Sequence, residues 1–192
     1  MRGSGRGARR QVKSLLSKLT QPQLGYAVAT LALVIDQLCK IVLLHGLGWI
    51  RTLGQPHSDI QYEVLPFFSI VMVWNRGISY GLLQADSDFH RWLLVFFALG
   101  VIGFLIWWLR GIKDTRLAIA IGLIIGGAIG NVIDRILYGA VADFFYLYAF
   151  GYDWYVFNVA DTAVVFGVAI MGLDLVMNEW RSRMRGAKED QT

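Results

Sequence analysis

The sequence is poor in the residues that build disulfide frameworks and metal centres. Its 192 residues include one cysteine, three prolines and three histidines. A single cysteine excludes an intramolecular disulfide and a cluster of thiolate metal ligands. Cys39 lies within an apolar run, where a free thiol behaves as a small hydrophobic side chain. The HExxH motif of zinc peptidases is also missing, so no metal site and no cofactor are predicted.

Charged residues are scarce as well, and long apolar segments separate them. Charged residues make up 17% of the chain and hydrophobic residues 56%, with a mean hydropathy of +0.50. The charged share is lower than in an ordinary soluble domain, and the hydrophobic share and mean hydropathy are higher. Four segments approach the roughly 20 residues that cross a bilayer: about 24–45, 89–109, 117–138 and 158–179. The sequence therefore predicts a mainly α-helical membrane protein with four transmembrane helices.

The lysines and arginines predict how these helices are oriented. They gather before the first segment, between the second and third, and after the fourth. Cytoplasmic loops carry an excess of basic residues, so we expect both termini in the cytoplasm. We expect a basic cytoplasmic arm at 1–23, a single transmembrane domain at 24–180 and a basic cytoplasmic tail at 181–192. Because the arm adjoins a long anchor, its expected partner is membrane lipid and no nucleic acid is predicted.

The two outer connections differ in character. Residues 46–88 contain a turn signal and the strand-like runs IQYEV and FFSIVMVW, which predict a small extracytoplasmic β-element. Residues 139–157 are dense in Phe, Tyr and Trp, which are typical of the membrane–water interface. We therefore expect an interfacial aromatic loop there.

Two aspartates near the outer interface are the main candidates for chemistry. An acid at the centre of a membrane helix costs about 2.5 to 3.5 kcal/mol, and less near the interface, so acids without a role are uncommon there. Asp143 and Asp161 have no basic residue at helical spacing and are expected at the same depth. Two neighbouring carboxyls cannot both ionise easily and share a proton, which leaves one acid and one base. This is the machinery of an aspartic protease.

Other polar residues within the spans fall into two groups. Asn131, Asp134 and Arg135 share one helical face and are predicted to form a hydrogen-bonded or ion-paired cluster inside the bundle. Asp36 and Lys40 are one helical turn apart and are interpreted as a structural pair. Glycines four residues apart in the third span predict close helix packing: Gly122, Gly126 and Gly130.

Two other functions have partial support in the sequence. Residues 77–81 fit GxSxG, so a serine-type membrane hydrolase using Ser79 is one alternative, but that motif needs a soluble α/β sheet, which is not expected here. A proton-coupled membrane carrier is the second, since intramembrane acids serve proton relays. The acids cluster at one membrane face and no inverted repeat is detectable, which disfavours a carrier.

Five strings in order, VIDQLCK, WNRGISYGLL, GGAIGNVIDR, GAVADFF and FNVADTAVVFG, resemble the motifs of bacterial lipoprotein signal peptidase, or signal peptidase II. The resemblance runs from about Val34 to Gly167. It implies an aspartic endopeptidase that removes signal peptides from prolipoproteins by cutting just before a diacylglyceryl-modified cysteine. It also implies a bacterial inner membrane. The charge distribution predicts an active site at the outer face, and an aromatic outer loop on a bundle open to lipid suits a two-chain substrate that enters from the bilayer. Nothing in four short spans demands a partner subunit, so we expect a monomer.

The resemblance assigns roles to individual residues. Asp143 and Asp161 match the two dyad aspartates, and Asp134 is expected to support Arg135 or the adjacent loop. Asp36 and Lys40 match a motif whose expected role is structural. Positions that line the site in the family correspond to Asn75, Asn131, Arg135, Asn158 and Ala160. Ile78 departs from the family pattern, which often has a small residue there, and leaves the local pocket shape open.

Overall fold

The computed structural model describes residues 19–55, 57–77 and 88–189. Four helices in this part are long and apolar enough to cross a membrane, at Gln21–Gly46, Asp88–Leu109, Thr115–Tyr138 and Val159–Trp180. The predicted four-helix membrane fold is thereby confirmed.

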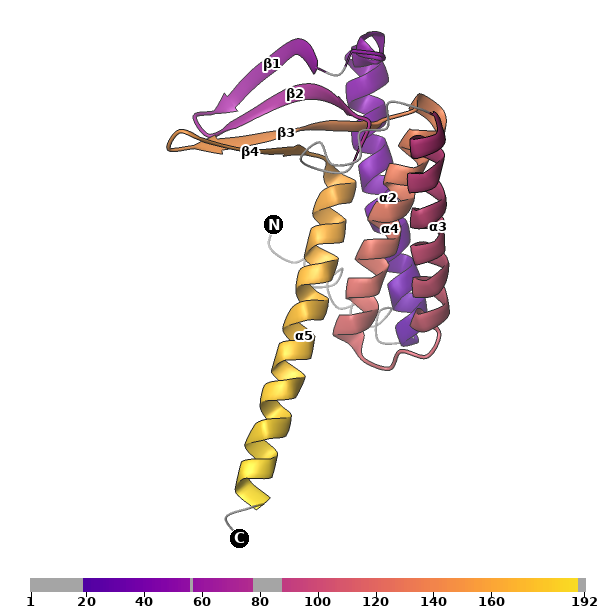
Figure 1. Ribbon diagram of the computed structural model, residues 1–192, viewed down its shortest axis with the longest axis vertical. Helices are drawn as coiled ribbons and strands as arrows, with labels where there is room; N and C mark the ends of the chain where they lie inside the picture. Colours follow the sequence, from indigo (N-terminus) through magenta and orange to yellow (C-terminus); the bar gives the residue numbers. More distant parts are fainter. Residues whose placement is uncertain (1–18, 56, 78–87, 190–192) are drawn as a thin grey trace, which may run out of the picture.

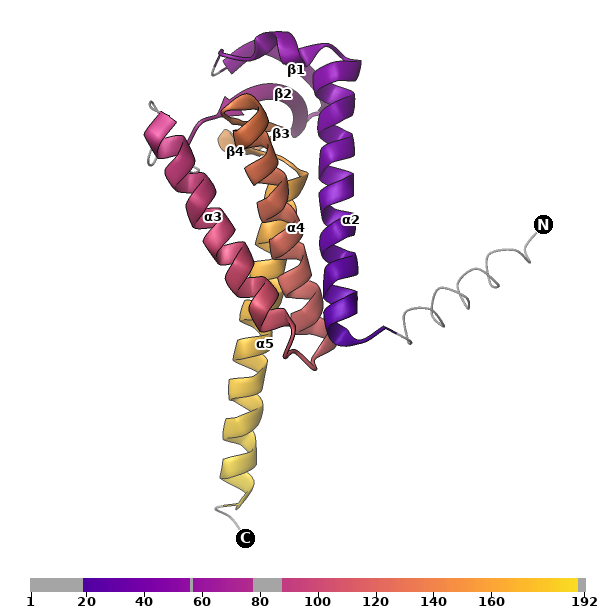
Figure 2. The ribbon, with the colours of Figure 1, turned by 90° about the vertical axis from the view of Figure 1, so that its right-hand side faces the viewer.

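The helices form an elongated bundle (Figures 1 and 2). α2 (Gln21–Ile41), α3 (Asp88–Leu109) and α4 (Thr115–Tyr138) lie together, and α5 (Val159–Glu189) starts beneath the sheet and extends past the other helices. The first span continues from α2 into a π-helical turn (Val42–Gly46), followed by a 3-10 turn (Trp49–Thr52).

A four-stranded antiparallel sheet lies at one end of the bundle, in the order β1 (His57–Leu65), β2 (Phe68–Asn75), β3 (Val141–Ala149) and β4 (Tyr152–Phe157). β1 and β2 fall within the predicted β-element. The aromatic segment predicted as a loop is instead the β3–β4 hairpin. β2 offers an edge with which β3 pairs, and this pairing satisfies backbone N–H and C=O groups near the membrane.

α4 is the central helix because its glycines let neighbouring backbones approach. A Cβ atom at Gly122 would contact the carbonyl oxygen of Gly25 in α2, and one at Gly126 would contact that of Ala29. A Cβ atom at Gly127, on another side of α4, would contact a carbonyl in the first turn of α5. The glycine spacing therefore packs α4 closely against α2, as predicted, and α4 also lies against α5.

The sheet is joined to the helix ends by an apolar cluster. α4 ends at Gly139, whose left-handed conformation (φ 77°) turns the chain into β3. The buried members of the cluster come from the end of the first span, the 3-10 turn, β2, the α4–β3 connection and β3: Leu44, Trp49, Met72, Trp74, Ala140, Ala142 and Phe144. This packing fixes the beginning of β3 against the ends of the first span and α4 that lie next to the sheet.

Candidate active site

Asp143 is the third residue of β3, and its side chain is 1% exposed. The β2–β3 register pairs Asn75 with Val141, so Asn75 and Asp143 are diagonal neighbours on one face. Asn75 Nδ2 donates to Asp143 Oδ2 at 2.9 Å. On the other side, Asn158 Nδ2 donates to Asp143 Oδ1 at 2.7 Å. Both carboxyl oxygens of Asp143 are thus held by amide donors.

Asp161 lies in the first turn of α5 and forms a reciprocal capping arrangement with Asn158. The Asp161 N–H donates to Asn158 Oδ1 at 2.8 Å, and the Asn158 N–H donates to Asp161 Oδ2 at 3.3 Å. This arrangement satisfies N–H groups that the start of a helix leaves unpaired. Asn131 Nδ2 of α4 donates to the remaining Asp161 oxygen, Oδ1, at 2.8 Å.

Asn158 connects the two carboxyls. It is fully buried, and its Nδ2 lies within hydrogen-bond distance of Asp143 Oδ1, of Asn131 Oδ1 (3.2 Å) and of the Ala142 carbonyl (3.3 Å). Its Oδ1 and its backbone N–H contact Asp161. One side chain therefore joins β3, α4 and α5 and brings both aspartates into a single hydrogen-bonded network.

The environments of the two carboxyls differ. Burial, and secondarily the negative charge of Asp161, raise the pKa of Asp143 well above its ordinary value, while the amide donors from Asn75 and Asn158 oppose this shift. Asp161 lies at the amino end of α5, where the helix dipole favours a negative charge. Such a pair can hold one proton and supply an acid and a base together.

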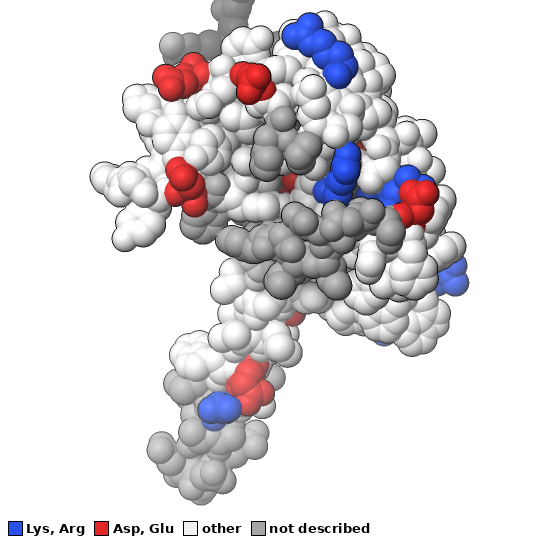
Figure 3. All heavy atoms as spheres, turned by 45° about the horizontal axis from the view of Figure 1, so that its top comes forward, with Lys and Arg blue, Asp and Glu red and all other residues white. Residues whose placement is uncertain are grey.

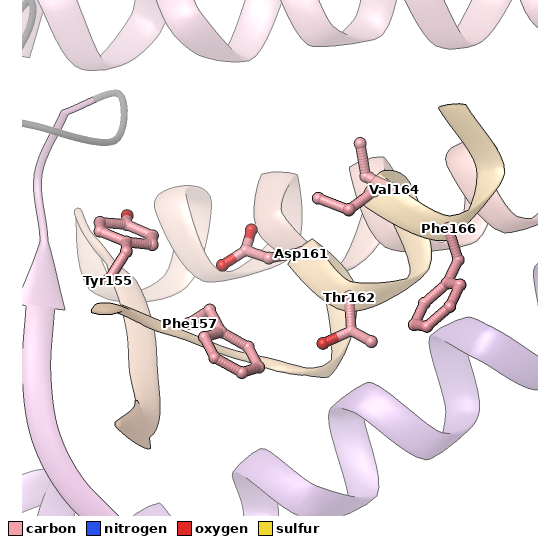
Figure 4. Close-up of a pocket in the computed structure, with 7 residues that line it drawn as sticks. Tyr155, Phe157, Asp161, Thr162, Val164 and Phe166 are labelled. Atoms are coloured by element: carbon pink, nitrogen blue, oxygen red, sulfur yellow. The ribbon is translucent and has the colours of Figure 1, made fainter. Parts of the chain in front are cut away.

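Asp161 forms part of the wall of a pocket of about 420 Å³ at the junction of β4 and α5. In Figure 4 the Asp161 carboxyl points towards Tyr155, and the Phe157 and Phe166 rings lie on either side of Thr162. The lining is mostly apolar: Tyr155, Phe157, Asp161, Thr162, Val164, Val165 and Phe166. Val165 and Phe166 are 66% and 60% exposed on a membrane-spanning helix, so this wall adjoins the lipid-facing surface.

The cluster predicted on α4 divides between two directions. Asp134 pairs with Lys40 of α2 at 2.8 Å and accepts the Ala142 N–H at 3.1 Å, so it contacts the start of β3. Arg135 is one residue further and points elsewhere. Its guanidinium donates to the Gly77 carbonyl at 3.1 Å and the Asn131 carbonyl at 3.4 Å. No ion pair between Asp134 and Arg135 is found among the described residues, contrary to one form of the expectation.

The remaining predicted residues are placed as follows. Asp36 and Lys40 are buried in α2 and form an ion pair at 2.8 Å. Ala160 is buried, and its N–H donates to Asp36 Oδ1 at 2.9 Å. Ile78 and Ser79 lie outside the described residues.

One residue of the site escaped the sequence reasoning. Tyr155 belongs to the segment predicted as an interfacial aromatic loop. Its hydroxyl accepts a hydrogen bond from Asn75 Nδ2, and the same amide group also contacts Asp143. Reading residues 152–157 as a strand with alternating faces is the signal that would have separated Tyr155 from its neighbours.

Figure 3 shows the end of the molecule that carries the sheet. Its described surface is mostly uncharged, with scattered acidic and basic side chains, some of which lie side by side. Within residues 19–55, 57–77 and 88–189, no three His, Cys, Asp or Glu side chains come together as a metal site. The buried carboxyls and their amide donors are therefore the main polar chemistry at this end.

The fold and site define a multi-pass membrane protein with a buried, hydrogen-bonded carboxyl pair. Comparison with known proteins identifies the family, because a model of the family described as signal peptidase (SPase) II matches residues 28–177. The chain belongs to the signal peptidase II family and is a peptidase.

Relatives and solved structures agree with this assignment. A lipoprotein signal peptidase of Methylobacterium radiotolerans is 44% identical over 163 residues, covering 85% of this chain and 91% of the relative. One from Methylorubrum extorquens is 48% identical over 147 residues, covering 77% and 81%. A bacterial membrane enzyme solved by the in meso method at 2.3 Å resolution has a TM-score of 0.69 and 25% identity, covering 81% of this chain and 88% of its own.

Proposed function

We propose that Asp143 and Asp161 are the catalytic dyad of an aspartic endopeptidase. The observation that carries this proposal is the position of Asn158, which is fully buried and contacts both carboxyls. A residue that holds one carboxyl through its side chain and the other through its backbone N–H fixes their relative position before substrate binds, and such preorganisation lowers the cost of reaching the transition state. The pocket beside Asp161 supplies space for a peptide next to the pair.

The two aspartates take different roles in this proposal. Asp143 holds the shared proton because it is almost fully buried and its pKa is raised. Asp161 is the carboxylate because it lies in the first turn of α5, where the helix dipole favours a negative charge. Asn75, Asn131 and Asn158 act as positioning residues, and Arg135 holds the chain at Gly77 beside them: each contact is a hydrogen bond within the network.

The reaction follows from these protonation states. Asp161 accepts a proton from water as the water oxygen bonds to the scissile carbonyl carbon, and Asp143 gives its proton to the carbonyl oxygen. The resulting gem-diol collapses when Asp161 passes its proton to the leaving nitrogen and the C–N bond breaks. One hydroxyl proton of the gem-diol returns to Asp143. The products are a carboxylic acid and an amine, and both aspartates regain their starting states.

The substrate class is inferred from the relatives and the pocket. Both relatives described above are named lipoprotein signal peptidase. We infer that this chain removes signal peptides from diacylglyceryl-modified prolipoproteins, cleaving just before the lipidated cysteine. An apolar pocket with Val165 and Phe166 on its lipid-facing wall suits a substrate that reaches the site from within the bilayer.

The proposed placement is a bacterial inner membrane, with both termini in the cytoplasm and the site at the outer face. Arg110, Lys113 and Arg116 lie in or next to the α3–α4 connection, at the end of the bundle opposite the sheet. The positive-inside rule assigns that end to the cytoplasm. We also expect the enzyme to act as a monomer.

Cleavage of a diacylglyceryl-modified prolipoprotein by purified protein in detergent tests the proposal. Asp143→Asn and Asp161→Asn are each expected to abolish cleavage while remaining folded, as judged by a cooperative thermal unfolding transition. Asp174→Asn is the matched control, because Asp174 is an acid of the same helix whose described contact is with Asn178, away from the site. Cleavage by either dyad variant at the wild-type rate would refute the assignment, and equal cleavage of a peptide without the lipid would refute the substrate class.

A further inference from the structure

A buried lysine joins two carboxylates that the dyad itself does not include. Lys40 Nζ lies 2.8 Å from Asp36 Oδ2 and 2.8 Å from Asp134 Oδ2. The three residues are 2%, 0% and 1% exposed, so their charges are removed from both water and lipid. We call this group the Lys40 bridge; it connects α2 to α4.

Each carboxylate of the Lys40 bridge also accepts a backbone N–H. Asp36 Oδ1 accepts from Ala160 at 2.9 Å, and Asp134 Oδ2 accepts from Ala142 at 3.1 Å. These two amides immediately precede the dyad: Ala160 comes just before Asp161, and Ala142 just before Asp143. The Lys40 ammonium group is therefore linked to the backbone next to each dyad aspartate through one ion pair and one hydrogen bond: through Asp36 to Ala160, and through Asp134 to Ala142.

Resting on the proposed dyad, we propose that the Lys40 bridge sets the relative position of Asp143 and Asp161, which makes Asp36, Lys40 and Asp134 positioning residues for the reaction. Shifts of about 1 Å in reacting groups can cost roughly 100-fold in rate. A link to the backbone adjoining each aspartate controls such shifts directly.

The packing around Asp36 leaves little freedom for this link. A Cβ atom at Gly130 would lie 2.5 Å from Asp36 Oδ2 and 3.3 Å from the Ala160 Cβ. The absence of a side chain at Gly130 thus lets the carboxylate lie against the α4 backbone and still reach the first turn of α5. A negative charge at that turn is favourable because unpaired N–H groups and the helix dipole point towards it.

The charge of Lys40 also acts on the dyad. The groups that face Asp143 from the surrounding elements are Lys40 of α2, Arg135 of α4, Asp161 of α5 and Tyr155 of β4. The Lys40 charge lowers the pKa of Asp143, against the larger opposing effects of burial and Asp161. Asp143 must be protonated to act as the acid, so activity falls as pH rises through its pKa. Loss of the Lys40 charge is expected to move that alkaline limb to higher pH.

The test measures kcat, KM and the pH–rate profile on lipidated substrate for Lys40→Met and Lys40→Arg. For Lys40→Met, we expect kcat to fall by roughly 100-fold with KM nearly unchanged, and the alkaline limb to move upwards. Lys40→Arg keeps the charge and is expected to keep the limb in place. Arg183→Met is the matched control, because it removes the cation of an exposed i,i+4 pair with Glu179.

If Lys40→Met does not fold, a second pair of variants tests the positioning role of the Lys40 bridge. Asp36→Asn keeps an oxygen that can accept the Ala160 N–H, whereas Asp36→Ala does not. At equal folded fraction, the Asn variant is expected to retain the larger kcat. Wild-type kcat and pH profile per folded molecule in Lys40→Met, or equal kcat in the two Asp36 variants, would overturn the proposal. Asp143→Asn separates the two inferences. If this variant is active, the proposed catalytic dyad is wrong. If it is inactive while the Lys40 variants have wild-type kcat and pH profile, the dyad stands and only the positioning role of the Lys40 bridge is wrong.

Discussion

Replacing Asn158 separates its two roles in the molecule. Its backbone and Oδ1 cap α5, and its Nδ2 donates to Asp143. Ser caps helices about as well as Asn, whereas Ala at this position costs typically about 1 kcal/mol. Ser lacks the amide donor at Nδ2. Asn158→Ser should therefore keep the cap and lose the contact with Asp143, and Asn158→Ala should lose both.

The magnitudes follow from these contacts. Asn158→Ala is expected to lower the free energy of unfolding by about 1 kcal/mol relative to Asn158→Ser, which is the value of the cap. Hydrogen bonds to charged groups are worth about 1.5 to 3 kcal/mol. If the 2.7 Å bond to Asp143 acts fully in the transition state, kcat falls by roughly 10- to 150-fold in both variants.

Two assays on the same preparations provide the comparison: denaturant unfolding in detergent and steady-state cleavage of lipidated substrate. Stability should distinguish Ser from Ala at position 158, and kcat should not. A Ser variant with both stability and kcat close to wild type would show that Asn158 acts only as a helix cap. The role assigned to its Nδ2 would then be wrong.

Two further predictions concern stability. The folded-state pKa of Asp143 lies above the unfolded value of about 3.9, so the native state binds more protons between these two values and stability falls as pH rises through that window. As pH rises between the two pKa values, the Tm of Asp143→Asn should increase relative to the Tm of wild type, and the difference should become constant above the folded-state pKa. A Tm difference that does not change with pH would contradict the raised pKa of Asp143. Gly126→Ala should destabilise the protein by about 1 to 3 kcal/mol, because the new Cβ would contact the Ala29 carbonyl oxygen. Gly100→Ala on α3 is its control, since a Cβ there meets nothing within 4 Å, and equal unfolding free energies for the two variants would refute close packing at Gly126.

The spans and the candidate acids could be predicted because each has a local signal. Apolar length and flanking charges mark the four helices, and an acid near a membrane interface is uncommon enough to be noticed. Asp143 and Asp161 were selected on that basis, and the structure places them in one hydrogen-bonded network through Asn158. Their assignment as the dyad stays a proposal.

The partners of these residues could not be predicted, because they depend on how distant elements pack. Lys40 contacts Asp134 across the α2–α4 contact, and no spacing along the chain indicates that bond. The β3–β4 hairpin was also missed, since its aromatic density suited an interfacial loop equally well. The hairpin is defined by tertiary pairing: β3 pairs with β2, β4 pairs with β3, and this arrangement brings Tyr155 of β4 to Asn75 of β2.

The Lys40 bridge also bears on how the protein is made. Asp36 and Lys40 enter the membrane with the first span and Asp134 enters with the third, whereas the N–H group of Ala160, which Asp36 binds, belongs to the last. A chain halted after α4 therefore lacks that donor, and burying a polar group without a partner is costly. The same last span brings Asp161. Completion of membrane insertion and assembly of the site are therefore a single event, and a partly synthesised chain holds only half of the carboxyl pair.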